Sequence, residues 1–196
     1  MTRSERDVPR AGAPERAGEP SFVVRPATPW DARSFYDKFS AVVAERRFLR
    51  SETPHGSVRH YRKSFGRSWT GDEASLVAVV GSRVVGHLNV SREEHPVTRH
   101  VASLGMAVAA EWRGRGVGSA LLREAIRWAR EVGVEKLALS VYPDNAEARA
   151  LYRKFGFAEE GRLTGHSKKG VGYRDEIVMG LWLVPQPDGS GHAGPP

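Results

Sequence analysis

The chain has 196 residues, of which 40% are hydrophobic, a size that suits one globular domain with a buried core and is short for two. The formal net charge of +7 favours anionic partners, among them nucleic acids, anionic lipids and phosphorylated cofactors. The absence of cysteine excludes disulfides, thiolate metal ligands and a cysteine nucleophile, and it fits a reducing compartment.

No run of the sequence approaches the roughly 20 apolar residues that span a bilayer, and residues 1–20 lack the apolar core of a signal peptide. We therefore expect a cytoplasmic protein without a membrane partner. Residues 1–20 and 185–196 are rich in proline, glycine and charge, so they cannot bury enough apolar surface to offset the entropy of ordering. These segments are expected to be disordered tails around a single domain, residues 21–184.

The first half of that domain predicts one strand, two helices and three strands. A strand is expected at residues 22–25, and Thr28, Pro29 and Asp31 then suit the N-cap, first position and first turn of a helix. A second helix is expected near residues 57–68. Two β-rich runs at 75–80 and 83–90 are joined by Gly81-Ser82, which suits a hairpin turn, and 99–108 is a third strand.

The second half predicts a helix, a strand, a helix and two closing strands. Residues 117–131 form an amphipathic helix that stops at Gly133. A strand (136–142), a helix (145–155) and two strands within 157–163 and 173–184 follow. This order predicts an α/β (α+β) fold with antiparallel arms and one β-α-β crossover.

A glycine-rich stretch, RGRGVGS (113–119), lies in that crossover, after a strand and at the mouth of a helix. Free backbone N–H groups and the positive end of the helix dipole favour a phosphate there, and glycines let a pyrophosphate approach closely. A flexible, solvated loop is the alternative. The stretch matches neither GxxxxGK[ST] nor GxGxxG, which disfavours a kinase and a dehydrogenase.

Two segments together resemble a known family. Arg113-x-x-Gly116-x-Gly118 follows a strand ending in Met-Ala-Val and precedes Leu-Leu-x-x-Ala, which resembles the acetyl-CoA signature of the GNAT superfamily of N-acetyltransferases. LSVYPDNAEARALYRKFGF (139–157) resembles the second segment of that superfamily. The resemblance covers about residues 75–184, and the strand 83–90 and the last two strands are similar to bacterial members that acetylate free amino acids or small amines.

The resemblance implies a GNAT-like mixed, mostly antiparallel sheet with a splayed β-α-β core that binds acetyl-CoA, and helices flanking it. It places a β-bulge in the strand Met106, Ala107 and Val108, which would pair with the pantetheine arm, and Asn145 would hydrogen-bond that arm. Tyr152 would face the sulfur and protonate the leaving thiolate, and the N–H near Val108 would hold the oxyanion. The pyrophosphate would be held by the loop residues Arg113, Gly114, Arg115, Gly116, Val117, Gly118 and Ser119.

Several alternatives stay open. Asn145 is also an ordinary helix N-cap, and Tyr152 could be a packed core residue. A nucleic-acid-binding domain would use the positive charge, but the sequence has no helix-turn-helix or RNP-like motif, so we expect no nucleic-acid partner. An acetyl-CoA-binding regulator would keep the fold without activity. The histidines show no metal-ligand spacing, and no metal is expected.

The general base and the quaternary state are less defined. Many relatives carry a carboxylate at the position of Ser103, and serine cannot act as the base alone; Glu93, Glu94 and His87 are the other candidates. A chain short of a base should favour α-amines of free amino acids, or polypeptide N-termini, over the more basic ε-amines. The apolar last strand, which includes Trp182, favours a homodimer.

Overall fold

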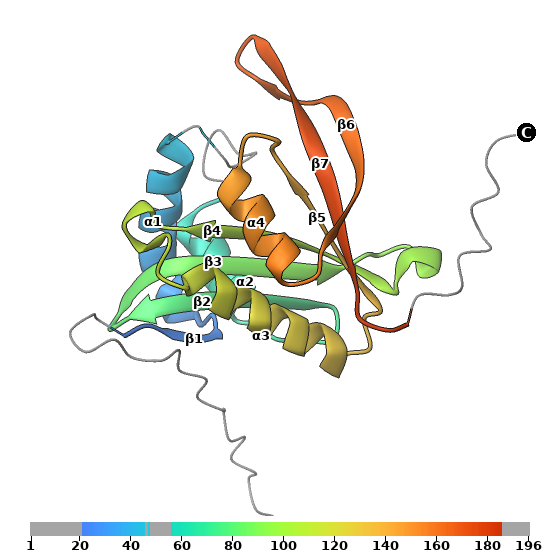
Figure 1. Ribbon diagram of the computed structural model, residues 1–196. Coiled ribbons are helices and arrows are strands. Elements are labelled where there is room, and N and C mark those ends of the chain that lie inside the picture. Colours follow the sequence, from blue (N-terminus) through green and yellow to red (C-terminus); the bar gives the residue numbers. More distant parts are fainter. Residues whose placement is uncertain (1–20, 46, 48–55, 186–196) are drawn as a thin grey trace, which may run out of the picture.

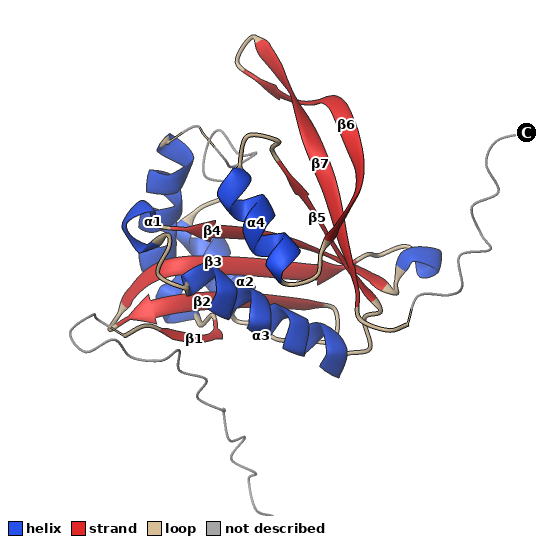
Figure 2. Cartoon of the chain, viewed as in Figure 1, coloured by secondary structure: helices blue, strands red, loops and turns tan. Residues whose placement is uncertain are grey.

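The computed structural model describes residues 21–45, 47 and 56–185 (Figure 1). The expected tails, except for Pro185, lie outside the described residues. Seven strands form one sheet in the order β1-β2-β3-β4-β5-β7-β6 (Figure 2). The strands are β1 (Val23–Pro26), β2 (Glu73–Val80), β3 (Arg83–Arg92), β4 (Val101–Val108), β5 (Lys136–Val141), β6 (Ala158–Lys169) and β7 (Gly172–Trp182).

The helices are α1 (Ala32–Ala44), α2 (Val58–Phe65), α3 (Val117–Glu131) and α4 (Ala146–Lys154), with short 3-10 turns at η1 (Pro29–Asp31), η2 (Pro96–Thr98) and η3 (Ala110–Trp112). Every neighbouring pair of strands is antiparallel except β4 and β5, which are parallel and joined through α3. The expected order of elements and the mixed, mostly antiparallel sheet are confirmed. Of the two closing strands, β6 extends further than expected, to Lys169, whereas β7 starts one residue earlier and ends two residues earlier than expected.

Helices cover both faces of the sheet, and successive residues of β3 alternate between the two faces. A Cβ on Gly86 would meet Val117 and Leu121, so this residue faces α3. The next residue, His87, lies on the opposite face, where its ring centroid is 4.5 Å from that of Phe35 in α1. The sheet therefore has one large core under α3 and α4 and a smaller one under α1 and α2.

Helix α3 begins and ends where the sequence predicts. Gly116 precedes its first residue with φ +82°, and Gly133 follows its end with φ +73°, conformations that glycine adopts at little cost. The apolar residues on its inner face are buried, among them Val117, Leu121, Leu122, Ala125 and Ala129. Trp128, which the sequence analysis did not place there, is fully buried, and its Nε1 donates to the carbonyl oxygen of Thr70 at 2.8 Å.

The central feature of the sheet is a gap between its two parallel strands. β4 and β5 pair only from Val101–Ser103 to Lys136–Ala138, so the two strands separate beyond Ser103. α3 starts at the end of β4 and α4 follows β5, which places both helix N-termini near the open end of the gap (Figure 1).

Candidate active site

The backbone of β4 points hydrogen-bonding groups into this gap. Gly86 and Val108 are opposite each other in the β3–β4 register, and the N–H of Ala109 donates to the carbonyl oxygen of Val85 at 2.9 Å. Because the neighbouring residues Ala109 and Val85 make this hydrogen bond, Gly86 and Val108 make none with each other. The N–H and C=O of Val108 therefore point away from β3, toward β5. The same alternation turns the backbone of Met106 toward the gap.

The β-bulge expected in this strand is wrong. The register of β4 against β3 continues without a shift from Ala102 to Val108, all residues that the structure describes. The gap arises instead because β5 leaves the parallel pairing after Ala138. Met106, Ala107 and Val108 therefore expose backbone groups by strand separation alone.

The three glycines at the start of α3 serve two different purposes. Gly114 and Gly116 have φ values of +72° and +82°, and a Cβ on either would meet no atom within 4 Å. These two glycines allow the turn and leave its backbone open to a ligand. Gly118 has an ordinary helical backbone, but a Cβ there would lie 3.0 Å from Leu151 of α4 and 3.5 Å from Met106, so it allows α3 to approach α4 and β4.

The two arginines of the stretch have partners within the chain. The guanidinium of Arg113 donates to both carboxylate oxygens of Glu45 at 2.8 Å and to the carbonyl oxygen of Val108 at 3.2 Å. The guanidinium of Arg115 lies over the buried ring of Trp112, 5.4 Å from its centroid. Arg113 thus connects the end of α1 to the strand that borders the gap.

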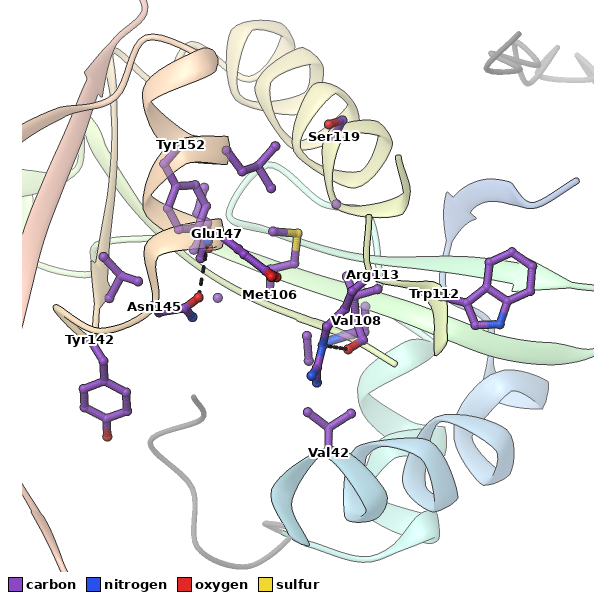
Figure 3. A pocket seen from close by; sticks show the side chains of 18 of the residues that line it. Val42, Met106, Val108, Trp112, Arg113, Ser119, Tyr142, Asn145, Glu147 and Tyr152 are labelled. Atoms are coloured by element: carbon purple, nitrogen blue, oxygen red, sulfur yellow. Dashed lines mark hydrogen bonds between the residues drawn. The ribbon is translucent and has the colours of Figure 1, made fainter. Parts of the chain in front are cut away.

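A cavity of about 870 Å³ occupies the gap and extends to both faces of the sheet. Figure 3 shows Met106 and Val108 of β4 on one side and Asn145 and Tyr152 of α4 on the other. Ten of the twelve residues predicted to bind the cofactor line it; of the other two, Val117 is buried in the core and Arg115 is exposed. These ten are Met106, Ala107, Val108, Arg113, Gly114, Gly116, Gly118, Ser119, Asn145 and Tyr152.

Asn145, the N-cap of α4, and Tyr152, within α4, each have features of both interpretations that the sequence left open. The Oδ1 of Asn145 accepts the N–H of Ala148 at 3.2 Å, as an N-cap does, and the residue also lines the cavity. Tyr152 is 6% exposed and packs near Phe157, yet it too lines the cavity. Burial raises the pKa of Tyr152 to about 12, so its phenol keeps its proton at physiological pH.

Polar side chains also line the cavity on the face of the sheet that α1 covers. His87, Asn89 and Ser140 are among them, and so is Glu176 of β7, a carboxylate that is 1% exposed. The Ser167 hydroxyl of β6 donates to Oε1 of Glu176. Glu176 was not among the predicted site residues. It follows Arg174 and Asp175 and comes just before the apolar run IVMGLW, so the sequence around it did not show that this carboxylate is buried.

The other candidate bases are placed differently. Glu93 and Glu94 are exposed and do not line the cavity; Glu93 accepts a hydrogen bond of 2.8 Å from Ser103. His87 lines the cavity, and no described residue hydrogen-bonds its Nε2, which is buried. Burial lowers the pKa of His87 to about 4, so the imidazole is neutral near pH 7.

Among the described residues, no three His, Asp or Glu side chains are grouped to bind a metal ion. None of the helices in that part of the chain is long and apolar enough to cross a membrane.

A splayed pair of parallel strands, a glycine-rich helix start and a second helix over the gap define the class of protein. The family model described as the acetyltransferase (GNAT) family matches residues 42–157, more than half of the chain. The chain therefore belongs to the GNAT family.

Individual relatives agree with this assignment. The chain is 39% identical over 108 residues to the L-amino acid N-acetyltransferase AaaT of Escherichia coli, an alignment that covers 53% of this chain and 65% of that protein, somewhat less than two thirds. Its structure is similar to that of a GNAT acetyltransferase from Streptococcus pneumoniae, with a TM-score of 0.77, 25% identity, and coverage of 83% of this chain and 99% of that one. The fold is also that of yncA from Salmonella typhimurium, described with its cofactor acetyl-CoA, with a TM-score of 0.76, 17% identity, and coverage of 84% and 95%.

Proposed function

We propose that the protein transfers the acetyl group of acetyl-CoA to a primary amine, and that its acceptor is the α-amino group of a free amino acid or a related small molecule. One observation carries the donor half of this proposal. The backbone of Met106 and Val108 points into a cavity that begins at the glycine-rich start of α3. A strand edge can pair with an extended pantetheine arm, and a helix N-terminus suits its pyrophosphate.

The chain's own residues divide the work of binding the donor. The amides of Gly114, Gly116 and Ser119 would hold phosphate oxygens, since the first amides of a helix have no intrahelical partner. The amide of Asn145 would contact the pantetheine arm. Arg113 would not contact the donor directly. Its hydrogen bonds to Glu45 and Val108 would hold β4 in place, and β4 is the strand that pairs with the pantetheine arm.

The reaction needs an oxyanion site and a proton for the departing thiolate. The N–H of Val108 is directed at the gap, where the thioester carbonyl would lie, and a preorganised donor of this kind stabilises the charge that develops on oxygen. Tyr152 is a protonated phenol that lines the same cavity. It would give its proton to the thiolate as the carbon–sulfur bond breaks.

Two observations support a free amino acid as the acceptor. The relative with 39% identity is named as an L-amino acid N-acetyltransferase. Beside Tyr142, which lines the cavity, the Arg174 guanidinium lies 3.8 Å from the ring centroid and the Lys169 ammonium lies 5.2 Å from it, and Arg174 also forms an ion pair with Asp144. Cations next to a residue that lines the cavity, together with the Glu176 carboxylate inside it, suit a molecule that carries both an ammonium and a carboxylate.

The test is a measurement of free CoA thiol, with acetyl-CoA and each of the twenty L-amino acids, at several pH values from 6.5 to 9. We expect α-amines to be acetylated faster than ε-amines of matched size at pH 7, because an amine with pKa near 8 is easier to deprotonate than one near 10.4 by about 3 kcal/mol.

Two outcomes would favour other functions. Acetylation of peptide N-termini in preference to free amino acids would indicate a protein N-terminal acetyltransferase. Tight acetyl-CoA binding in calorimetry without thiol release for any amine would indicate an acetyl-CoA-binding regulator.

A further inference from the structure

We propose that Glu176 is the group that binds the acceptor amine and accepts its proton, in place of the carboxylate that β4 lacks at Ser103. This inference rests on the proposed function, since it requires an amine acceptor. Its starting point is the position of a carboxylate that is 1% exposed yet lines the cavity.

The strand registers place Glu176 beside the reactive part of the gap. Continuing the parallel register of β4 and β5 brings Val141 level with Met106 and Tyr142 level with Ala107. In the next pair of strands, Val141 is opposite Ile177. Glu176 is therefore level with the stretch of β4 whose backbone N–H groups point into the gap.

Alternation along β7 decides which face the carboxylate takes. Ile177 and Met179 belong to the core under α3 and α4, the face on which Tyr152 lies. Glu176 lies on the opposite face. The proton donor for the thiolate and the acceptor for the amine proton would thus approach the gap from different faces of the sheet, so each can serve a different group of the tetrahedral intermediate.

Small residues of β4 leave room for an acceptor on that face. Gly105 is opposite Asn89 and Ala107 is opposite His87, and all four line the cavity. A Cβ on Gly105 would meet no atom within 4 Å. An amine could therefore lie over this part of β4, between the strand and Glu176.

The remaining carboxylates of the cavity are less suited to this role. Glu45 is held by two hydrogen bonds from Arg113, and Glu147 is exposed in the first turn of α4. Glu176 is buried, and its Oε1 accepts a hydrogen bond from the Ser167 hydroxyl. Burial strengthens the attraction between a carboxylate and an ammonium ion.

The charged and titratable groups around this site come from four strands. Among the described residues, these strands contribute His87 of β3, Tyr142 of β5, Lys169 of β6 and Arg174 of β7, together with Glu176 itself. Asp144 forms an ion pair with Arg174, and Glu45 and Arg113 line the same cavity. The pKa of His87, about 4, lies below the pH range from 6.5 to 9 in which the acceptor would be tested.

The proposed step balances as follows. An acceptor that arrives as the ammonium ion first gives one proton to the Glu176 carboxylate, which passes it through water to the solvent. The neutral amine nitrogen then forms a bond to the thioester carbon, the carbonyl π electrons move to oxygen, and a second N–H proton passes to the Glu176 carboxylate. When the carbonyl re-forms, the carbon–sulfur bond breaks and the sulfur takes the proton from Tyr152. Glu176 then returns its proton through water to the phenolate, so the products are the amide and the CoA thiol.

The experiment compares Glu176→Gln with Glu93→Gln, using the L-amino acid that the wild-type protein acetylates fastest. We expect Glu176→Gln to lower kcat/KM for the amino acid about 100-fold at pH 7, the size of effect typical of a general base. The deficit should shrink toward pH 9, because more of the amine arrives already neutral. KM for acetyl-CoA should stay within about twofold, since Glu176 lies on the other face from the donor's proton source. Glu93→Gln should match the wild type.

A second variant separates positioning from structure. Ser167→Ala should lower kcat/KM for the amino acid about tenfold, because the carboxylate loses one orienting hydrogen bond. A loss in Glu176→Gln that is equal at every pH would assign Glu176 a structural role and overturn the proposal, as would an unchanged rate. A wild-type protein that acetylates no amine would instead refute the proposed function, and this inference with it.

Discussion

The guanidinium of Arg113 and the carboxylate of Glu45 form a bidentate pair, with two hydrogen bonds of 2.8 Å between residues that are 68 positions apart. The pair joins the end of α1 to the loop before α3, and Arg113 also holds the carbonyl oxygen of Val108. The arginine of the glycine-rich stretch therefore has a partner inside the protein.

The first prediction concerns this pair. Glu45→Gln keeps the shape of the side chain but removes the charge that orients Arg113. We expect it to raise KM for acetyl-CoA about fivefold and to destabilise the fold by about 1 kcal/mol, since both side chains are 30% exposed. Steady-state kinetics and urea unfolding measure the two effects. Tighter acetyl-CoA binding in the variant would contradict this expectation and mean that Arg113, once released from Glu45, binds the pyrophosphate. Asp37→Asn, at an exposed pair on α1, is the control.

The second prediction concerns the helix start. Ser119→Asp adds a negative charge in the first turn of α3, where it favours the helix itself but repels a phosphate. Calorimetry should show the affinity for acetyl-CoA falling about 100-fold while the melting temperature is kept. Gly118→Asp should lose at least as much affinity, and there the Cβ also crowds Leu151 at 3.0 Å. Ser119→Ala is the control. If both aspartate variants bind acetyl-CoA with the affinity of the wild type, the pyrophosphate lies elsewhere.

The third prediction concerns the phenol. Tyr152→Phe should keep KM for acetyl-CoA within about twofold and lower kcat about 100-fold, the contribution expected of a general acid. Because burial raises the pKa of Tyr152 to about 12, ionisation of this group should not reduce the wild-type rate at any pH up to 9. A variant with wild-type turnover would make Tyr152 a packing residue only.

The fourth prediction concerns stability at acid pH. The pKa of His87 is about 4 in the folded protein and 6.5 in an unfolded chain, so the unfolded state binds more protons between these values. Stability from the neutral imidazole is fully present above pH 6.5 and is lost as the pH falls to 4, by up to about 3 kcal/mol. His87→Leu removes the titrating group, so its free energy of unfolding should fall less between pH 7 and pH 4.5 in urea titrations. Equal losses in the two proteins would contradict the assignment.

The fifth prediction concerns the homodimer that the last strand favours. Trp182 accounts for part of that apolar bulk within the chain, since its ring is 6.3 Å from that of His100 and 5.4 Å from the ammonium of Lys136. Light scattering at working concentration should give twice the mass of the chain. The mass of one chain, unchanged on concentration, would contradict the dimer.

The sequence alone predicted the order of the main helices and strands, although Thr28 caps the 3-10 turn η1 and α1 begins only at Ala32. Apolar residues recurring on one face, between a glycine-rich start and Gly133, specify α3 at its observed bounds, and Gly81-Ser82 specifies the β2–β3 turn. These are local signals, because a helix face or a two-residue turn depends on residues close along the chain. Five of the seven residues of the glycine-rich stretch, together with Asn145 and Tyr152, line the cavity.

Only the tertiary structure decided what faces the cavity from the other side. β7 inserts between β5 and β6, and this non-local pairing, which no short pattern encodes, brings Glu176 beside the gap. The partner of Arg113 was equally hidden, because Glu45 reaches it from a distant helix. Likewise, the strand separation that exposes Val108 comes from where β5 stops pairing, and not from a bulge in β4. Strand order and side-chain neighbours are set by packing across the whole chain, so the pattern of each segment leaves them open.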